Sequence, residues 1–402
     1  MDKLIQTLQE INWNFSDYNS SKYPLDINSI PWYPATFIPP IPKFLIGLLT
    51  KPGDIVFDPF GGKGTTAVEA LKQNRIPISN DLNPFASEIV NAIFYSVDFC
   101  LKSDCFMSDE ATRLKGHEIS ANLLHSFVIE HNINADVFDW YDSETLAELL
   151  SIMSLMFQEL ADDDKLFYVR KLALSSIFKA ASSQPGHFTY VTDNCKPSKL
   201  VYKNAKQLYL NKVQQITLAA KDFIKQFSIT NPSVSIANIL QKVKVVTGDA
   251  RKLNWIDDRS VNLVLTSPPY LCAQDYIKTM RLTNLFFQNK AGFEEAYKDE
   301  IGPRSKRRSK PDIVVPKFYS DMNMVFSNIK RVLVPGGYFC LVIGQGKAKI
   351  TESYDTISDL CHDIQDKHGL EKIHHATRKI SNRVIQVGGV SKEDIIIFQN
   401  SN

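Results

Sequence analysis

Residues 54–73, DIVFDPFGGKGTTAVEALKQ, place three kinds of local structure next to one another. Residues 54–57, of which 55–57 are apolar, predict a buried strand, and the spacing of apolar residues in 67–73 predicts a helix. The glycines between them let the backbone approach a ligand closely, and the helix start offers N–H groups that have no partner within the helix. This order of strand, glycine-rich turn and helix predicts a ligand site at the carboxyl end of a strand in a Rossmann-like sheet.

The turn carries an acid where a phosphate-binding loop would not. The spacing Gly-x-Gly-x-x-Ala from Gly62 fits the loose dinucleotide fingerprint, but the lysine of the turn is not followed by Ser or Thr as in a P-loop. Asp58 would repel a pyrophosphate, and it suits a cationic ligand such as the amino group of a methionine moiety. A second predicted strand at 76–79 leads to Asp81, at a spacing typical of an acid that binds ribose hydroxyls.

A second turn, Thr266-Ser267-Pro268-Pro269-Tyr270, follows the apolar run 261–265. Two consecutive prolines fix the backbone and remove two N–H donors. Ser267 and the carbonyl groups of the turn would then accept hydrogen bonds from an amino group, while the Tyr270 ring would stack on a flat heterocycle. The alternative is a loop with two prolines and a packed tyrosine.

Together the two turns resemble those of the DNA amino-methyltransferases of restriction-modification systems, which modify cytosine N4 or adenine N6 and use S-adenosylmethionine. Residues 58–66 resemble the cofactor loop of that family, and residues 267–270 resemble its catalytic tetrapeptide. Three softer matches extend the resemblance. Residues 33–39 resemble the segment that closes over the methionine end of the cofactor, and residues 246–250 resemble a segment whose acid would face the adenine amino group. Residues 332–338 resemble the turn before the fifth strand.

The resemblance implies a set of site residues and S-adenosylmethionine as the cofactor, with no metal. The residues expected to be catalytic are Ser267, Pro268, Pro269 and Tyr270. Those expected to bind the cofactor are Phe37, Asp58, Pro59, Phe60, Gly62, Gly64, Thr65, Asp81 and Asp249. Because an enzyme cannot reach the amino group inside a duplex, the target base is expected to flip into the pocket.

Several functions are compatible with these turns. Family members with Ser before Pro-Pro-Tyr are mostly cytosine N4 enzymes, so we expect a site-specific DNA methyltransferase acting there. The alternatives are an adenine N6 enzyme, an RNA amino-methyltransferase, and a non-catalytic nucleotide-binding protein. Methylation of cytosine carbon-5 needs a cysteine after a proline; no Pro-Cys pair occurs, and Cys272, the thiol nearest the turn, is interpreted as a packing residue.

Binding to double-stranded DNA would need a local basic surface, because the 402-residue chain has a net charge of only +2. The expected DNA-binding residues are Arg304, Lys306, Arg307 and Arg308, together with His187 in the turn-rich loop 182–190. A solvated basic loop and a turn packed on helices are the alternatives. The family resemblance also implies a cognate restriction endonuclease acting on the same DNA site.

The composition is that of a globular protein, with 44% hydrophobic and 22% charged residues. The first ten residues lack the apolar core of a signal peptide, and no run of 18 apolar residues occurs. The six cysteines form no Cys-x-x-Cys pair, so we expect reduced thiols, no zinc site and a cytoplasmic protein without membrane contact.

The order of elements predicts an α/β fold with a doubly wound, Rossmann-like methyltransferase sheet. Further strands are expected at 243–247, 261–265 and 339–343, and residues 372–380 and 394–399 are expected to form an antiparallel C-terminal hairpin at the sheet edge. Residues 1–99 and 241–402 are expected to form the catalytic domain that binds S-adenosylmethionine. Residues 100–240 read as a helical insertion, to which we assign target recognition.

Overall fold

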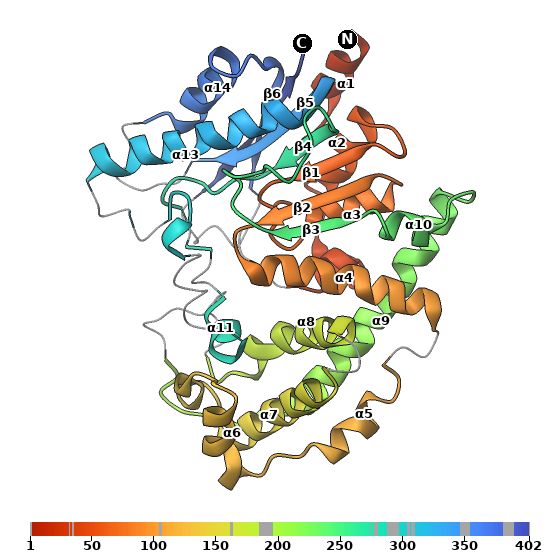
Figure 1. Ribbon diagram of the computed structural model, residues 1–402, viewed down its shortest axis with the longest axis vertical. Coiled ribbons are helices and arrows are strands. Elements are labelled where there is room, and N and C mark those ends of the chain that lie inside the picture. The colour runs from red at the N-terminus through yellow and green to blue at the C-terminus, as the bar shows by residue number, and fades with distance from the viewer. Residues whose placement is uncertain are drawn as a thin grey trace.

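The computed structural model describes residues 2–31, 33, 36–103, 107–160, 164–184, 196–273, 275–276, 280–287, 297–303, 306, 310–345, 354–380 and 390–401. Its centre is a seven-stranded sheet in the order β3-β2-β1-β4-β5-β7-β6 (Figure 1). The strands are β1 Ile55–Asp58, β2 Ile76–Asp81, β3 Lys244–Thr247, β4 Val261–Thr266, β5 Leu333–Gly344, β6 Glu371–Lys379 and β7 Lys392–Gln399.

The sheet is parallel except around β7. Strands β1 to β5 pair in parallel, whereas β7 pairs antiparallel with both β5 and β6. Strand order reverses at β1, with β2 on one side and β4 on the other, so the ends of these strands form a topological switch point where ligands bind. The predicted doubly wound α/β sheet and its C-terminal hairpin are therefore confirmed.

Helices cover both faces of the sheet, which explains why its central strands β1 and β4 are mostly apolar. Successive residues of a strand point to opposite faces. In β4, Leu263 and Leu265 pack with the amino-terminal helices α1 Asp2–Glu10 and α2 Pro40–Leu49, while Val264 packs with the opposite layer. That opposite layer contains α13 Pro311–Val332 and α14 Thr356–Asp366.

The amino-terminal segment contributes to the core of the sheet domain. Leu8 is fully buried and Trp13 is 5% exposed, and both pack against the face that α2 covers. The chain then returns to the pocket at Tyr33 and Phe37, which are buried as well. This packing fixes one wall of the ligand site to the sheet.

A second body of helices lies beyond α4 Pro84–Lys102, which separates it from the sheet (Figure 1). Its long helices are α7 Ser143–Gln158, α8 Asp164–Ala181 and α9 Ala205–Thr230. The shorter α-helices of the described chain are α3 Thr65–Lys72, α5 Glu110–Arg113, α6 Leu124–Glu130, α10 Ile236–Leu240 and α11 Arg281–Phe287. Five 3₁₀-helices are Ser20–Lys22, Ile27–Ser29, Leu114–Gly116, Ala121–Leu123 and Ala135–Asp139.

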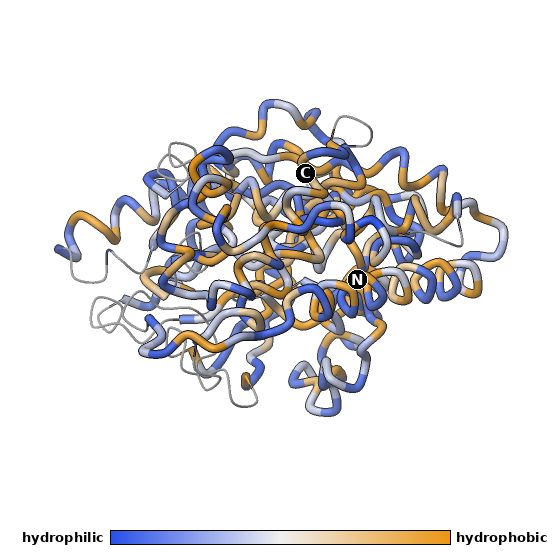
Figure 2. The backbone as a smooth tube through the Cα atoms, turned by 90° about the horizontal axis from the view of Figure 1, so that it is seen from below, coloured by the Kyte–Doolittle hydropathy of each residue, from blue (hydrophilic) through white to orange (hydrophobic). Residues whose placement is uncertain are grey.

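The helical body follows from amphipathic sequences and from polar residues at helix starts. Figure 2 shows apolar and polar residues alternating along the helices. Asp142 caps α7 by accepting the Glu144 N–H, and Asn204 caps α9 in the same way. The predicted boundary at residue 100 falls in the last turn of α4, so this helix crosses from the predicted catalytic domain into the predicted insertion.

An apolar helix of membrane-spanning length does not occur in the described part of the chain. The four cysteines that the structure describes, Cys100, Cys272, Cys340 and Cys361, are buried and form no disulfide with one another.

Candidate active site

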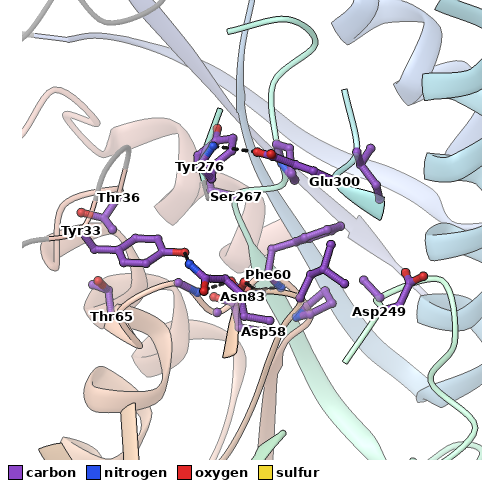
Figure 3. A pocket seen from close by; sticks show the side chains of 18 of the residues that line it. Tyr33, Thr36, Asp58, Phe60, Thr65, Asn83, Asp249, Ser267, Tyr276 and Glu300 are labelled. Carbon is purple, nitrogen blue, oxygen red and sulfur yellow. Dashed lines mark hydrogen bonds between the residues drawn. The ribbon is translucent and has the colours of Figure 1, made fainter. Parts of the chain in front are cut away.

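A pocket opens at the carboxyl ends of β1, β2 and β4, where the switch point predicts a ligand site (Figure 3). Among the described residues, the expected site residues that line it are Phe37, Asp58, Pro59, Phe60, Gly62, Thr65, Asp81, Asp249, Ser267 and Pro269. The two turns identified in the sequence are therefore brought to one pocket. Gly64, Pro268 and Tyr270 lie behind the lining.

Asp58 lies at the floor of the pocket, at the last position of β1. It is 2% exposed, and its oxygens accept hydrogen bonds from the hydroxyls of Thr266 at 2.6 Å and Thr66 at 2.8 Å and from the Phe60 N–H at 3.0 Å. Burial raises the pKa of Asp58 to about 6, although these three donors act in the opposite direction. Asp58 therefore joins β1 to β4, besides presenting an acid to the pocket.

Asp81 ends β2 and holds the glycine turn in place. Its carboxylate accepts the N–H groups of Gly62 and Asn83, each at 2.8 Å. Burial raises the pKa of Asp81 to about 6, and the two backbone donors lower it. Asn83 caps α4 through the Phe85 N–H and donates from its side chain to the Tyr33 hydroxyl at 3.3 Å.

The start of α3 offers the pocket a polar group that has no partner in the described structure. The Thr65 hydroxyl is buried, lines the pocket and makes no hydrogen bond to a described residue. Gly64, just before it, has φ +84°, and a Cβ there would lie 2.7 Å from Val90 Cγ2. Gly64 thus lets α3 approach α4, whereas Thr65 and the helix start face the ligand space.

Asp249 lies across the pocket from Tyr33 (Figure 3), but its charge is already matched. Arg251 contacts both of its oxygens, with Nη2 2.9 Å from Oδ2, and also pairs with Asp321 at 2.9 Å. Burial acts to raise the pKa of Asp249, but the Arg251 guanidinium holds it below its usual range. The expected contact of Asp249 with an adenine amino group stays a prediction, and the Asp-x-Arg spacing was the signal for this pairing.

The residues of the predicted catalytic turn, 266–270, differ in the direction in which their side chains point. Ser267 and Pro269 face the pocket, whereas Tyr270 is 8% exposed and turns inward. The Tyr270 hydroxyl lies 3.1 Å from Ser267 Oγ and donates to Glu393 Oε1 of β7 at 3.0 Å. Stacking of Tyr270 on a base stays a prediction, and in this structure its hydroxyl links the turn to the hairpin.

Tyr276 and Glu300 are among the pocket residues that were missed in the sequence. Tyr276 and Glu300 form the wall above Ser267 (Figure 3), and the Tyr276 N–H donates to Glu300 Oε1 at 2.7 Å. Both lie in the long connection between β4 and α13, where no periodic pattern or glycine motif marks a site. Burial raises the pKa of the Tyr276 phenol, which keeps it a neutral hydrogen-bonding group.

The predicted DNA-binding residues fall largely outside the described residues: Arg304, Arg307, Arg308 and His187 are among those not described. Lys306 is described and exposed. Cys272 is 3% exposed, and burial and then Asp275 raise the pKa of its thiol to about 11. A thiol of this kind is a poor nucleophile, which fits its interpretation as a packing residue.

The lining fits S-adenosylmethionine better than a dinucleotide. Its charged side chains among the described residues are all acids, with Asp299 and Glu300 joining those predicted, and no Lys or Arg is among them. Such a wall attracts a sulfonium and an ammonium group and repels a pyrophosphate, while the Thr65 hydroxyl at the α3 start suits a carboxylate. Within the described part of the chain, no group of three or more His, Cys, Asp or Glu is placed to hold a metal ion.

Comparisons with known proteins agree with this site. Residues 5–92 match the family described as DNA methylase, N6_N4_Mtase. Type II methyltransferase M.MjaI of Methanocaldococcus jannaschii is 34% identical over 27% of this chain and 34% of its own length. Type II methyltransferase M.MvaI of Kocuria varians is 22% identical over 95% of this chain and 90% of its own length.

A solved SAM-dependent methyltransferase of Methanosarcina mazei is 10% identical, covers 89% of this chain and 96% of its own, and has a TM-score of 0.33. That similarity is too weak to bear on the assignment. The family match includes β1, the glycine turn and β2, which build the cofactor side of the pocket. Residues 5–92 are therefore similar to the N6/N4 DNA methylases, and the two relatives that the chain matches are Type II methyltransferases.

Proposed function

We propose that this protein transfers a methyl group from S-adenosylmethionine to the exocyclic N4 of a cytosine flipped out of double-stranded DNA. One observation carries the proposal: the Ser267–Pro269 turn and the acids Asp58 and Asp81 line the same pocket. A base amine held at that turn would lie beside a ligand held by these acids. The reaction then depends largely on positioning, which is worth many orders of magnitude in rate.

The bound cofactor supplies an activated methyl group on a sulfonium, so the residues of this chain mainly bind, orient and accept hydrogen bonds. An exocyclic base amine is a poor nucleophile because its lone pair is delocalised into the ring. Ser267 Oγ and the Pro268 carbonyl would accept its N–H groups and favour the tetrahedral nitrogen of the transition state. The proline nitrogens bring no N–H that would compete at this edge.

Three structural features support roles for the cofactor-side residues. Asp81 would accept ribose hydroxyls, as its place after β2 suggests. Thr65 Oγ and the start of α3 would bind the methionine carboxylate, and Asp58 would attract the ammonium group. Phe37 and Phe60 supply apolar walls of the pocket.

The choice of cytosine N4 rests on Ser267 at the first position of the tetrapeptide. The test is to incubate the protein with S-adenosylmethionine carrying a labelled methyl group and with unmethylated DNA or RNA, and then to identify the labelled nucleoside by mass spectrometry. We expect N4-methylcytosine in DNA. N6-methyladenine would retain the mechanism but change the base, whereas labelled RNA alone, 5-methylcytosine or a thiol adduct at Cys272 would contradict the proposal.

We also propose that the helical insertion recognises the DNA target and that the basic loop holds DNA phosphates. Replacing both Arg307 and Arg308 with Ala should weaken binding to all DNA sequences alike. The slope of log affinity against log salt should fall by about 0.9 for each phosphate that the loop no longer binds. A changed sequence preference with an unchanged salt slope would contradict this role. A cognate endonuclease, the further partner we propose, would be expected to cut the same site only when it is unmethylated.

A further inference from the structure

The catalytic turn is connected to the C-terminal hairpin by a chain of hydrogen bonds. Ser267 Oγ lies 3.1 Å from the Tyr270 hydroxyl, which lies 3.0 Å from Glu393 Oε1. Arg378 of β6 completes the chain, with Nη1 3.1 Å from Glu393 Oε2. The side chains of Arg378 and Glu393 are only 6% and 12% exposed, so water contributes little to their pairing.

The hydrogens available along this chain of hydrogen bonds determine which group donates and which accepts in each bond. Arg378 is permanently charged and only donates, so it favours the carboxylate form of Glu393, which can only accept. Tyr270 has a single hydroxyl hydrogen, and it is given to Glu393. The contact between Ser267 and Tyr270 must therefore use the Ser267 hydrogen. Ser267 then has no hydrogen left for the pocket and presents only lone pairs there.

We propose that Glu393 is a positioning residue for methyl transfer, which makes Ser267 an obligate hydrogen-bond acceptor toward the target base. This inference rests on the proposed function, since it takes the ligand at Ser267 to be a base amine. An acceptor-only edge favours an amino group, as on cytosine or adenine, over a carbonyl oxygen, as on uracil or thymine. Glu393 thereby sets specificity from β7, two strands from β4 in the sheet, without touching the base.

The packing around Tyr270 leaves its hydroxyl little choice of position. A Cβ at Gly344, the last residue of β5, would lie 2.9 Å from Tyr270 Cε2 and 2.5 Å from Val390 Cγ1. The Tyr270 ring therefore packs closely against Gly344, where a larger residue would not leave room for it. Phe in place of Tyr270 would keep this packing and remove only the hydroxyl.

The groups that face Glu393 explain how its charge is kept. Burial raises the pKa of Glu393 above its usual range, whereas Arg378 and the Tyr270 hydroxyl act to lower it and so limit the rise, and Tyr276 lies close enough to interact with its charge. Because Arg378 requires an acceptor, Glu393→Gln would place the amide oxygen toward Arg378 and the amide nitrogen toward Tyr270. That variant reverses the chain, and the Ser267 hydrogen would then point into the pocket.

The first test measures turnover of three variants with saturating DNA and cofactor. Tyr270→Phe leaves the Ser267 hydroxyl without its partner and should lower kcat about tenfold. Glu393→Gln directs the Ser267 hydrogen into the pocket and should lower kcat further. In both variants, KM for the cofactor should stay near the wild-type value. Asp394→Asn is the matched control, because this neighbouring β7 carboxylate points to the opposite face, toward His375 and Thr377. If Tyr270 acts through its ring alone, Tyr270→Phe will keep full turnover, and the inference is overturned.

The second test needs no turnover. Fluorescence anisotropy compares two labelled duplexes that carry cytosine or uracil at the target base, so that the amino group at C4 is replaced by a carbonyl oxygen and N3 gains a hydrogen. Wild type and Asp394→Asn should prefer the amino duplex, and Glu393→Gln should reduce that preference about tenfold. An unchanged preference would overturn the inference even if Glu393→Gln lowers stability.

The outcomes separate this inference from the proposed function. If the wild type labels no DNA, the proposed function fails and the inference fails with it. If the wild type labels DNA while Tyr270→Phe and Glu393→Gln keep its turnover and base preference, only the inference fails.

Discussion

The two sides of the pocket are built in different ways. On the cofactor side, the hydrogen bonds of Asp58 and Asp81 to the glycine turn and to the starts of α3 and α4 join residues 2 to 19 positions apart, and the bond from Thr266 to Asp58 adds one contact across 208 positions. On the catalytic side, Tyr270 reaches Glu393, 123 positions away. The first side is therefore fixed mainly by local backbone geometry, with one bond to β4, and the second depends on the correct pairing of β5, β7 and β6. Substitutions on the two sides should fail in correspondingly different ways.

The largest effect is expected where the cofactor side depends on a single glycine. Gly64→Ala introduces a side chain at φ +84° and a Cβ 2.7 Å from Val90 Cγ2. The backbone strain alone costs about 1–3 kcal/mol, and the steric clash adds to it. Urea denaturation should show a decrease of this size in the free energy of unfolding. Adding Val90→Ala to Gly64→Ala should restore the part of the free energy of unfolding that the steric clash removes. Equal stability of Gly64→Ala and wild type would contradict this constraint on the start of α3.

Asp81→Asn should weaken cofactor binding while leaving the fold largely intact. The amide keeps one acceptor for the turn but loses the charge, and a hydrogen bond to a charged group is worth about 1.5–3 kcal/mol. Calorimetry with S-adenosylmethionine measures the decrease in affinity. Asp142→Asn is the matched control, because Asp142 also accepts an N–H two residues ahead, that of Glu144, but it does so in the helical body. Equal affinity in Asp81→Asn and the control would remove Asp81 from the cofactor site.

These two positions show how far the sequence could predict the site. Gly64 and Asp81 act through neighbours along the chain, so the pattern of strand, turn and helix was enough to identify them. The hairpin of β6 and β7 was also predictable, since the apolar run Ile395–Phe398 is typical of a buried strand. Tyr276 and Glu300 were not, since their connection has no periodicity. Nor was the pairing of Tyr270 with Glu393, because strand order decides which distant residues meet.

Acidification should affect binding and stability of the cofactor side in opposite directions. The pKa values of Asp58 and Asp81 are raised from 3.8 to about 6 by burial, so the folded protein binds more protons than the unfolded chain between about pH 4 and 6. These two groups therefore lower the free energy of unfolding as pH rises through that range, by on the order of 1 kcal/mol per pKa unit. Cofactor affinity should rise over the same range, as the carboxylates become charged.

The measurement is the difference between wild type and Asp81→Asn, since other carboxylates titrate too. Thermal unfolding without cofactor and calorimetry with cofactor, both from pH 5 to 7, should each show a smaller pH dependence in the variant. Parallel pH curves for the two proteins would contradict the raised pKa of Asp81.

The smallest effect is expected at Tyr33, and it makes the sharpest comparison with Tyr270. Both tyrosines are buried, 8% exposed, at the edge of the pocket. Tyr33 contributes mainly its ring, which lies 3.4 Å from the position of a Cβ at Gly62, while its hydroxyl only accepts a long hydrogen bond of 3.3 Å from Asn83. Tyr33→Phe should therefore change cofactor affinity by less than about 1 kcal/mol and leave kcat unchanged. Tyr270→Phe should lower kcat about tenfold and leave cofactor affinity unchanged. The same atom is removed in both variants, so a difference in kcat reports whether the hydroxyl belongs to the chain that ends at Ser267. Equal effects on kcat would mean that both tyrosines serve as packing groups.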